Sequence, residues 1–204
     1  MTALPQLSKS ALGDADLPLY PALGLEHIHL VGSPEDFQAA LAALMGCDAI
    51  GFDTESKPTF QKGEASTGPH LVQLATDSQA FLFPVARLKE LDGLKAVLES
   101  PTLLKVGMGL GNDKASLQSR FGIGLANAID MGEVLRGPGH RGTVGAKVAV
   151  AHFFGQRLVK SKKVGTSNWA NPRLTDQQLR YAGNDAHVAL CIYRAWARSG
   201  KGQK

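Results

Sequence analysis

The chain has 204 residues, 44% hydrophobic and 20% charged, with a net charge of +4, which is typical of one soluble globular domain with a substantial core. No apolar run approaches the ~20 residues of a membrane span, and the first 25 residues lack a secretory signal, so we expect a cytoplasmic location and no membrane partner. The only two cysteines, Cys47 and Cys191, have no Cys or His at metal-ligand spacing, which favours free core thiols over a disulfide or a zinc site.

Strand and helix signals alternate along the chain. The strand-like apolar runs lie at 26–31, 48–55, 70–76, 80–84, 103–107 and 126–130. The helical periods lie at 34–45, 88–98, 112–121, 143–154 and 175–198. A short polar link joins the third and fourth strands, which predicts an antiparallel hairpin beside the strand at 48–55. This order predicts the α/β class, with a mixed sheet flanked by helices.

The ends of the chain differ from its centre. Residues 1–25 are rich in Pro, Leu and small residues without a period, and we expect an arm that lies on the surface or is partly disordered. The domain proper is expected at 26–198, followed by a basic tail at 199–204. Its last helix has a well-marked start, because Thr175 and Gln178 form the pattern of a capping box.

The strand at 48–55 carries two acids on one face, Asp53 and Glu55, because side chains alternate along a strand. Ile50 and Phe52 take the opposite face, together with Thr54, and can enter a core. Two carboxylates this close are unfavourable unless one is protonated, a Lys or Arg pairs with them, or a divalent cation binds their oxygens. An ordinary exposed pair of acids at a strand end is the alternative, and the strand alone does not decide between the two.

Two further acids stand where a fold can bring them to this strand. Asp113 lies at a helix N-terminus, where an acid is also favoured simply by the helix dipole. Asp185 lies in the last helix, four residues after Tyr181 and on the same inward-looking face, and a buried carboxylate needs a partner such as a metal. With Asp53 and Glu55 the acids carry about −4, which two divalent cations would neutralise; two metals ~3.5–4 Å apart serve in-line displacement at phosphorus. The Tyr181 hydroxyl is a candidate to orient the attacking water.

Positive charge is concentrated in residues 136–180, which contain nine Lys or Arg and one acid and so carry +8, leaving −4 for the remainder. A basic segment next to an acidic strand face suits a polyanion such as nucleic acid, with a solvated basic surface as the alternative. Lys162, Lys163 and Trp169 fall in an expected loop here and are candidate nucleic-acid contacts, since aromatic stacking contributes ~1–3 kcal/mol per base. Trp169 is equally suited to anchoring that loop on the core.

Three segments resemble the three motifs of the DEDDy 3′→5′ exonuclease superfamily, in the family's order: 52–55, 106–113 and 181–185. The segment 161–169 is similar to that of the subgroup with ribonuclease D and the Werner-syndrome exonuclease domain. The resemblance covers roughly residues 26–198. It implies a ribonuclease-H-like fold and two divalent cations, Mg²⁺ or Mn²⁺.

The resemblance also implies roles for individual residues. Asp53, Glu55, Asp113 and Asp185 would be the metal ligands, with Asp53 shared between the ions, and Tyr181 would position the attacking water. The implied reaction is hydrolysis of the terminal phosphodiester bond of DNA or RNA at a 3′ end, with release of a nucleoside 5′-monophosphate. Helical nucleic-acid-binding domains follow the last motif in ribonuclease D, but none is expected here. The grip on the substrate is therefore expected from the basic segment or from a protein partner.

Two other functions match parts of this sequence. A nucleic-acid-binding or scaffolding module would keep this fold with negligible turnover, but the intact acids and tyrosine argue against it. Gly107, Gly109 and Gly111, followed nineteen residues later by Asp130, imitate a dinucleotide-binding fingerprint. The third glycine falls one residue early, and an acid would stand where a pyrophosphate binds. We interpret Asp130 as a helix cap or a neighbour of the ligands, not as catalytic, and His187 as a surface residue.

Overall fold

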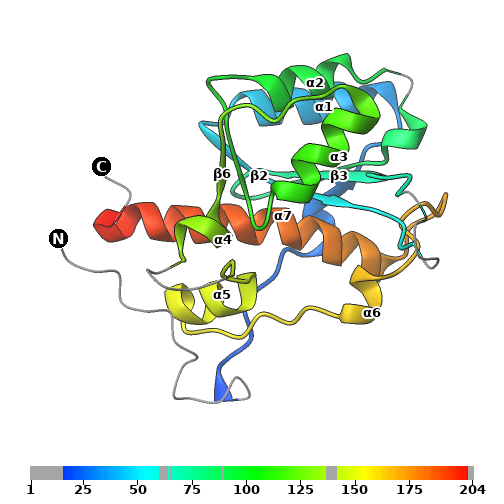
Figure 1. Ribbon diagram of the computed structural model, residues 1–204. Helices are drawn as coiled ribbons and strands as arrows, with labels where there is room; N and C mark the ends of the chain where they lie inside the picture. The colour runs from blue at the N-terminus through cyan, green and yellow to red at the C-terminus, as the bar shows by residue number, and fades with distance from the viewer. Residues whose placement is uncertain (1–15, 60–63, 65, 89, 137–141, 202–204) are drawn as a thin grey trace.

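The computed structural model describes residues 16–59, 64, 66–88, 90–136 and 142–201. Among them, six strands form one sheet in the order β1-β4-β3-β2-β5-β6 (Figure 1). The strands are β1 (Ile28–Leu30), β2 (Ala49–Glu55), β3 (Leu71–Ala75), β4 (Ala80–Phe83), β5 (Leu104–Gly107) and β6 (Ala128–Asp130). Both parallel and antiparallel pairs occur, so the predicted α/β class with a mixed sheet is confirmed.

The acidic strand β2 lies in the interior of the sheet. It pairs antiparallel with β3 and parallel with β5. The next pair, β3 and β4, is antiparallel, which confirms the predicted hairpin and its place beside the acidic strand. In the β2–β3 register, Asp53 stands opposite Gln73 and Glu55 opposite Leu71.

Helices cover both faces of the sheet. They are α1 (Pro34–Met45), α2 (Asp92–Glu99), α3 (Gly111–Phe121), α4 (Met131–Val134), α5 (Ala146–Phe154), α6 (Lys162–Gly165) and α7 (Asp176–Trp196). On one face α1, α2 and α3 pack on a core that includes Ile50 and Phe52. On the other face lie α4, α5 and α7, with the long α7 crossing the whole sheet (Figure 1). Asp53 and Glu55, which alternate with Phe52, therefore point toward α7.

Several element boundaries differ from the sequence expectations. The helix expected at 88–98 begins only at Asp92, because Val85–Arg87 forms a separate 3₁₀ turn. The first strand likewise begins after a 3₁₀ turn at Leu25–His27. The helix expected from 143 begins at Ala146, after an extended Gly145 that serves as its N-cap. The one-turn helices α4 and α6 were not predicted, since four residues show no period.

The helix α7 begins at the predicted capping box, where Thr175 and Gln178 each accept a hydrogen bond from the other's backbone N–H. Its backbone lies directly on β2 at Gly51, where any Cβ would overlap the carbonyl oxygen of Ala186. His187 was expected at the surface, but it is buried between α7 and the sheet, and its Nε2 lies 3.1 Å from the Asp77 carbonyl oxygen. That prediction was wrong because α7 is covered on nearly all sides.

The segment before β1 is held on the domain. Tyr20 N donates to Arg157 O at 3.0 Å, and Leu23 N donates to the Asn184 side chain at 2.7 Å. This part of the expected arm lies on the surface; residues 1–15, and residues 202–204 of the expected tail, lie outside the described residues. None of the helices described here is long and apolar enough to cross a membrane. Both cysteines are free and partly buried, as predicted.

Candidate active site

Three of the predicted acids meet between β2 and α7. Asp53 and Glu55 at the end of β2 and Asp185 on α7 place carboxylate oxygens within 4.8 Å of one another. The alternation of the strand supplies the first two, and the close seating of α7 on Gly51 supplies the third. Within the described residues this is the one group of three or more acids, cysteines or histidines with metal-ligand spacing.

A lysine partly neutralises this group. Lys160 Nζ lies 2.8 Å from Asp185 Oδ2, and the Asp185 side chain is only 8% exposed. The same ammonium lies over the Tyr181 ring, 5.3 Å from its centre. Lys160 belongs to the segment that leads from α5 to α6. The sequence places Lys160 in the basic segment, but nothing in the local pattern marks it as a partner of the acids.

The remaining charge is accommodated by shifted pKa values. Burial, followed by Asp53 and Asp185, raises the pKa of Glu55 to about 9. Burial, then Asp185 and Asp113, raises the pKa of Asp53 well above its usual range. Burial also raises the pKa of Asp185, while Lys160 and the Tyr181 hydroxyl act in the opposite direction. The cation-free protein therefore reduces the negative charge in two ways. Raised pKa values favour protonation of Asp53 and Glu55, and Lys160 pairs with Asp185.

Tyr181 stands at the edge of the acids, one turn before Asp185 on α7. Its hydroxyl shares a hydrogen bond with Asp185. Burial and the surrounding carboxylates raise the pKa of the phenol, so it stays a neutral hydroxyl. Gly165 of α6 packs against the hydroxyl, and a Cβ at that position would lie 2.5 Å from the phenolic oxygen. The tyrosine is therefore confined between α6 and the acids.

Asp113, the fourth predicted acid, lies beside the group rather than within it. Its Oδ1 accepts a hydrogen bond from the hydroxyl of Thr54, the residue between Asp53 and Glu55. Burial raises the pKa of Asp113, and the Thr54 hydrogen bond opposes that rise. Asp113 contributes to the raised pKa of Asp53, so the two carboxylates are electrostatically linked. Thr54 was assigned to the core by sequence, but its hydroxyl ties the acidic strand to α3.

Asp130 fixes the turn that presents Asp113. Its carboxylate accepts from Gly109 N at 2.9 Å, Leu110 N at 2.8 Å and Gly132 N at 2.9 Å. It is thus the N-cap of α4, one of the two roles considered for it. The same contacts exclude the dinucleotide-binding alternative, because an internal carboxylate already occupies backbone amides that a pyrophosphate would need.

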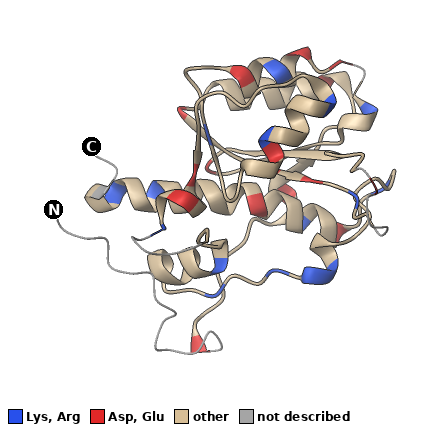
Figure 2. Cartoon of the chain, viewed as in Figure 1, with Lys and Arg blue, Asp and Glu red and all other residues tan. Residues whose placement is uncertain are grey.

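The basic segment lies on the same side of the sheet as α7, and one of its residues, Lys160, contacts the acids. Figure 2 shows Lys and Arg along α5, the chain that follows it and α6, beneath α7. Lys162 and Lys163 lie in α6 and not in a loop. The stacking role for Trp169 does not fit the structure, because the residue is only 2% exposed and its Nε1 donates to Gly165 O at 3.1 Å. This burial matches the alternative, an anchor for the segment.

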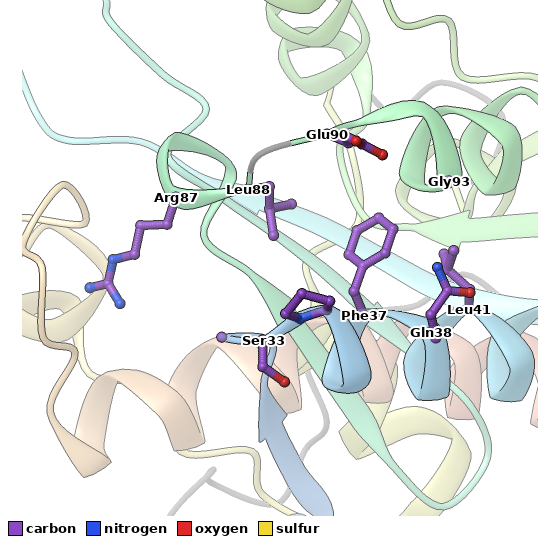
Figure 3. Close-up of a pocket in the computed structure, with 10 residues that line it drawn as sticks. Ser33, Phe37, Gln38, Leu41, Arg87, Leu88, Glu90 and Gly93 are labelled. Atoms are coloured by element: carbon purple, nitrogen blue, oxygen red, sulfur yellow. The ribbon is translucent and has the colours of Figure 1, made fainter.

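A separate cavity of about 300 Å³ lies on the opposite face of the sheet, between α1 and residues 87, 88, 90 and 93 (Figure 3). Its lining is largely apolar, with Phe37, Leu41 and Leu88 pointing into it. None of the acids described above lines it. It therefore lies apart from the carboxylate group.

A family model described as 3′-5′ exonuclease matches residues 28–199. The chain belongs to the 3′-5′ exonuclease family. The mouse bifunctional 3′-5′ exonuclease/ATP-dependent helicase WRN is 30% identical over 155 residues, which span 75% of this chain and 11% of that protein. The exonuclease mut-7 homolog of Aedes aegypti is 31% identical over 193 residues, 83% of this chain and 26% of that protein. This exonuclease chain thus spans well under two thirds of the length of either relative.

Solved structures agree with this assignment. The Aedes aegypti Nibbler EXO domain matches with a TM-score of 0.73 and 28% identity, over 89% of this chain and 92% of that one. Escherichia coli RNase D matches with a TM-score of 0.70 and 21% identity, over 85% and 46% of the two chains. The predicted ribonuclease-H-like fold and the resemblance to the exonuclease superfamily are confirmed. The predicted enzyme class, a 3′-5′ exonuclease, follows from the same family.

The acids of this exonuclease chain fit divalent cations. Asp53, Glu55 and Asp185 offer only hard carboxylate oxygens, the ligands preferred by Mg²⁺ and Mn²⁺. Their oxygens are close enough for one ion to contact all three residues. Burial and mutual repulsion of these carboxylates raise the pKa values of Glu55 and Asp53. A bound divalent cation would offset that repulsion and stabilise the ionised carboxylates.

Proposed function

We propose that this chain is a divalent-cation-dependent 3′→5′ exonuclease that hydrolyses the terminal phosphodiester bond of DNA or RNA. The products are nucleoside 5′-monophosphates, and the reaction uses two Mg²⁺ or Mn²⁺ ions. The observation that carries the proposal is the meeting of Asp53, Glu55 and Asp185, with the Tyr181 hydroxyl at their edge. Membership of the 3′-5′ exonuclease family supports the direction of attack.

The acids divide between the two ions. Asp53, Glu55 and Asp185 would hold one, while Asp53 and Asp113 would hold the other, so Asp53 is shared. The bound cations would polarise the scissile phosphate and stabilise the charge on the leaving oxygen. Tyr181 remains a neutral donor and acceptor and orients the attacking water. The hydrogen bond between Tyr181 and Asp185 and the packing of Gly165 support this placement.

Substrate is held by the basic residues beside the acids. Lys162 and Lys163 on α6 are the proposed phosphate contacts, and their position one turn from the Gly165–Tyr181 contact supports this role. One structural neighbour is Trypanosoma brucei RNase D in complex with RNA U12, which supports a nucleic-acid substrate for the fold. A protein partner that adds to the grip, and a cytoplasmic location, are part of the proposal.

The test is digestion of matched DNA and RNA oligonucleotides carrying a label at either the 3′ or the 5′ end, with Mg²⁺, Mn²⁺ or EDTA. The wild-type protein is compared with Asp53→Ala and Tyr181→Phe. We expect 3′ label to be lost first as mononucleotide, only with cation and not with Asp53→Ala. Tyr181→Phe should bind the oligonucleotide normally and cleave it at least tenfold more slowly, because removing one proton-transfer or orienting group typically costs 10²–10⁴-fold.

Two outcomes would contradict the proposal. Absence of cleavage with every cation, while oligonucleotides still bind, would favour the nucleic-acid-binding module. Cleavage that is unchanged by Asp53→Ala would place the reaction at other residues. The faster of the two polymers would identify the preferred substrate.

A further inference from the structure

Gln73 lies at the centre of β3 with its side chain fully buried. Its two cross-strand partners are Asp53 on β2 and Leu82 on β4. Residues directly opposite each other in an antiparallel pair share a face, with Cβ atoms ~4.5–5.5 Å apart. The side chains of Gln73 and Asp53 therefore start from neighbouring Cβ atoms, on the face covered by α7.

The rest of this environment is apolar. Leu71 and Ala75, two residues to either side of Gln73 on β3, pack with Ala182 and Ala186 of α7. Leu82 packs in the same cluster. Of the two side chains opposite Gln73, Asp53 is thus the one that can accept or donate a hydrogen bond.

The Gln73 amide is unsatisfied. Neither Oε1 nor Nε2 has a hydrogen-bond partner among the described residues. A buried polar group without a partner destabilises the fold, and a Met of similar volume would avoid that cost at this position. Asp53 Oδ1 accepts a hydrogen bond from Thr54 N at 2.9 Å. The unpaired amide of Gln73 and the carboxylate of Asp53 thus belong to opposite positions of one strand pair.

We propose that Gln73 is a positioning residue for Asp53. Its Nε2–H group, which has no partner within the described part of the cation-free structure, would donate to the Asp53 carboxylate once a divalent cation is bound and fix the orientation of that carboxylate. The inference rests on the proposed function, because it requires Asp53 to be a cation ligand. It adds a residue from β3 to a site otherwise built from β2, α3 and α7, and it explains why an unsatisfied amide is kept in an apolar layer.

The test compares wild-type protein with Gln73→Met and with Leu82→Met, a control on the other cross-strand partner. Mn²⁺ affinity is measured by isothermal titration calorimetry without nucleic acid, and Tm is measured in EDTA. We expect Gln73→Met to keep or raise Tm while its Mn²⁺ affinity falls about tenfold, the equivalent of ~1.4 kcal/mol. Leu82→Met conserves volume and should leave Mn²⁺ affinity unchanged. In activity assays kcat should fall with Gln73→Met while KM for the oligonucleotide stays constant.

Mn²⁺ affinity of Gln73→Met within twofold of wild type would overturn the inference, as would an equal loss in Leu82→Met. If Gln73→Met does not fold, the Gln73 side-chain amide is followed in the wild type by ¹⁵N NMR during Mg²⁺ titration. A shift that is absent in Asp53→Asn supports the inference, and an unchanged signal refutes it. If the wild-type protein binds no Mn²⁺, the proposed function is refuted as well. If the wild type binds Mn²⁺ but neither Gln73→Met nor the Gln73 amide signal responds, only this inference is refuted.

Discussion

The ion pair between Lys160 and Asp185 predicts an unusual effect of Lys160→Met. In the cation-free protein this substitution removes the ammonium that lies 2.8 Å from the Asp185 carboxylate. It leaves a nearly buried acid beside Asp53 and Glu55 without its positive neighbour. The cation-free protein should therefore lose stability, while the cation-bound protein should lose much less, because a divalent ion neutralises the same carboxylate.

The size of the loss follows from the burial of the two partners. Removing one partner of a fully buried ion pair costs ~3–5 kcal/mol. Here the Lys160 side chain is 29% exposed, so solvent weakens the pair, and Asp185 can take up a proton in place of the ammonium. We expect a loss of about 1–3 kcal/mol at pH 8 and a smaller loss at pH 5, where protonation of Asp185 is easy.

The assay is urea unfolding of wild type and Lys160→Met at both pH values, in EDTA and in Mn²⁺. Lys163→Met is the matched control, since it removes the same charge from the neighbouring helix α6, whereas the ion pair with Asp185 belongs to Lys160. Mn²⁺ affinity should rise with Lys160→Met, because a positive charge next to the site is gone. Equal destabilisation in EDTA and in Mn²⁺, or an equal effect of Lys163→Met, would refute the reasoning.

Three further predictions concern the surroundings of the acids. Because the folded pKa of Glu55 is about 9 against an ordinary 4.5, the cation-free fold holds a proton that the unfolded chain releases between these values. Thermal melts in EDTA should show Tm falling as pH rises through this window, and a rising Tm would contradict it. Asp130→Ala removes three backbone contacts and should lower the free energy of unfolding by about 2 kcal/mol in urea. Gly165→Ala should displace the Tyr181 hydroxyl and reduce kcat at least tenfold, whereas Gly142→Ala, where an added Cβ meets no neighbour, should leave kcat unchanged.

The sheet and the longest helix could be predicted because their signals are local. The alternation of the strand at 48–55 correctly placed Phe52 in one core and turned Asp53 and Glu55 to the other side. The capping box at Thr175 marked the start of α7 to the residue. Such patterns depend on residues only two to four positions apart, so they can be recognised in the sequence without the structure.

The partners of the acids could not be predicted in the same way. Lys160 reaches Asp185 from a segment without a period, and the contact depends on how residues 155–161 run along α5 and α7. Thr54 was correctly placed on the face opposite the other two acids, but its contact with Asp113 depends on the position of α3. Gln73 looked like an ordinary residue of a buried strand. In each case the tertiary arrangement, and not the local pattern, creates the interaction.

Gly51 explains how Asp53 and Glu55 on β2 come to lie beside Asp185 on α7, which is distant in the sequence. Gly51, Asp53 and Glu55 share one face of β2, since they are spaced by two. The Ala186 carbonyl of α7 occupies the space where a Gly51 side chain would be. That contact brings the preceding residue, Asp185, alongside Asp53. Any larger residue at position 51 would lift α7 from the strand and separate the carboxylates, so the geometry of the site is set by backbone packing before any cation binds.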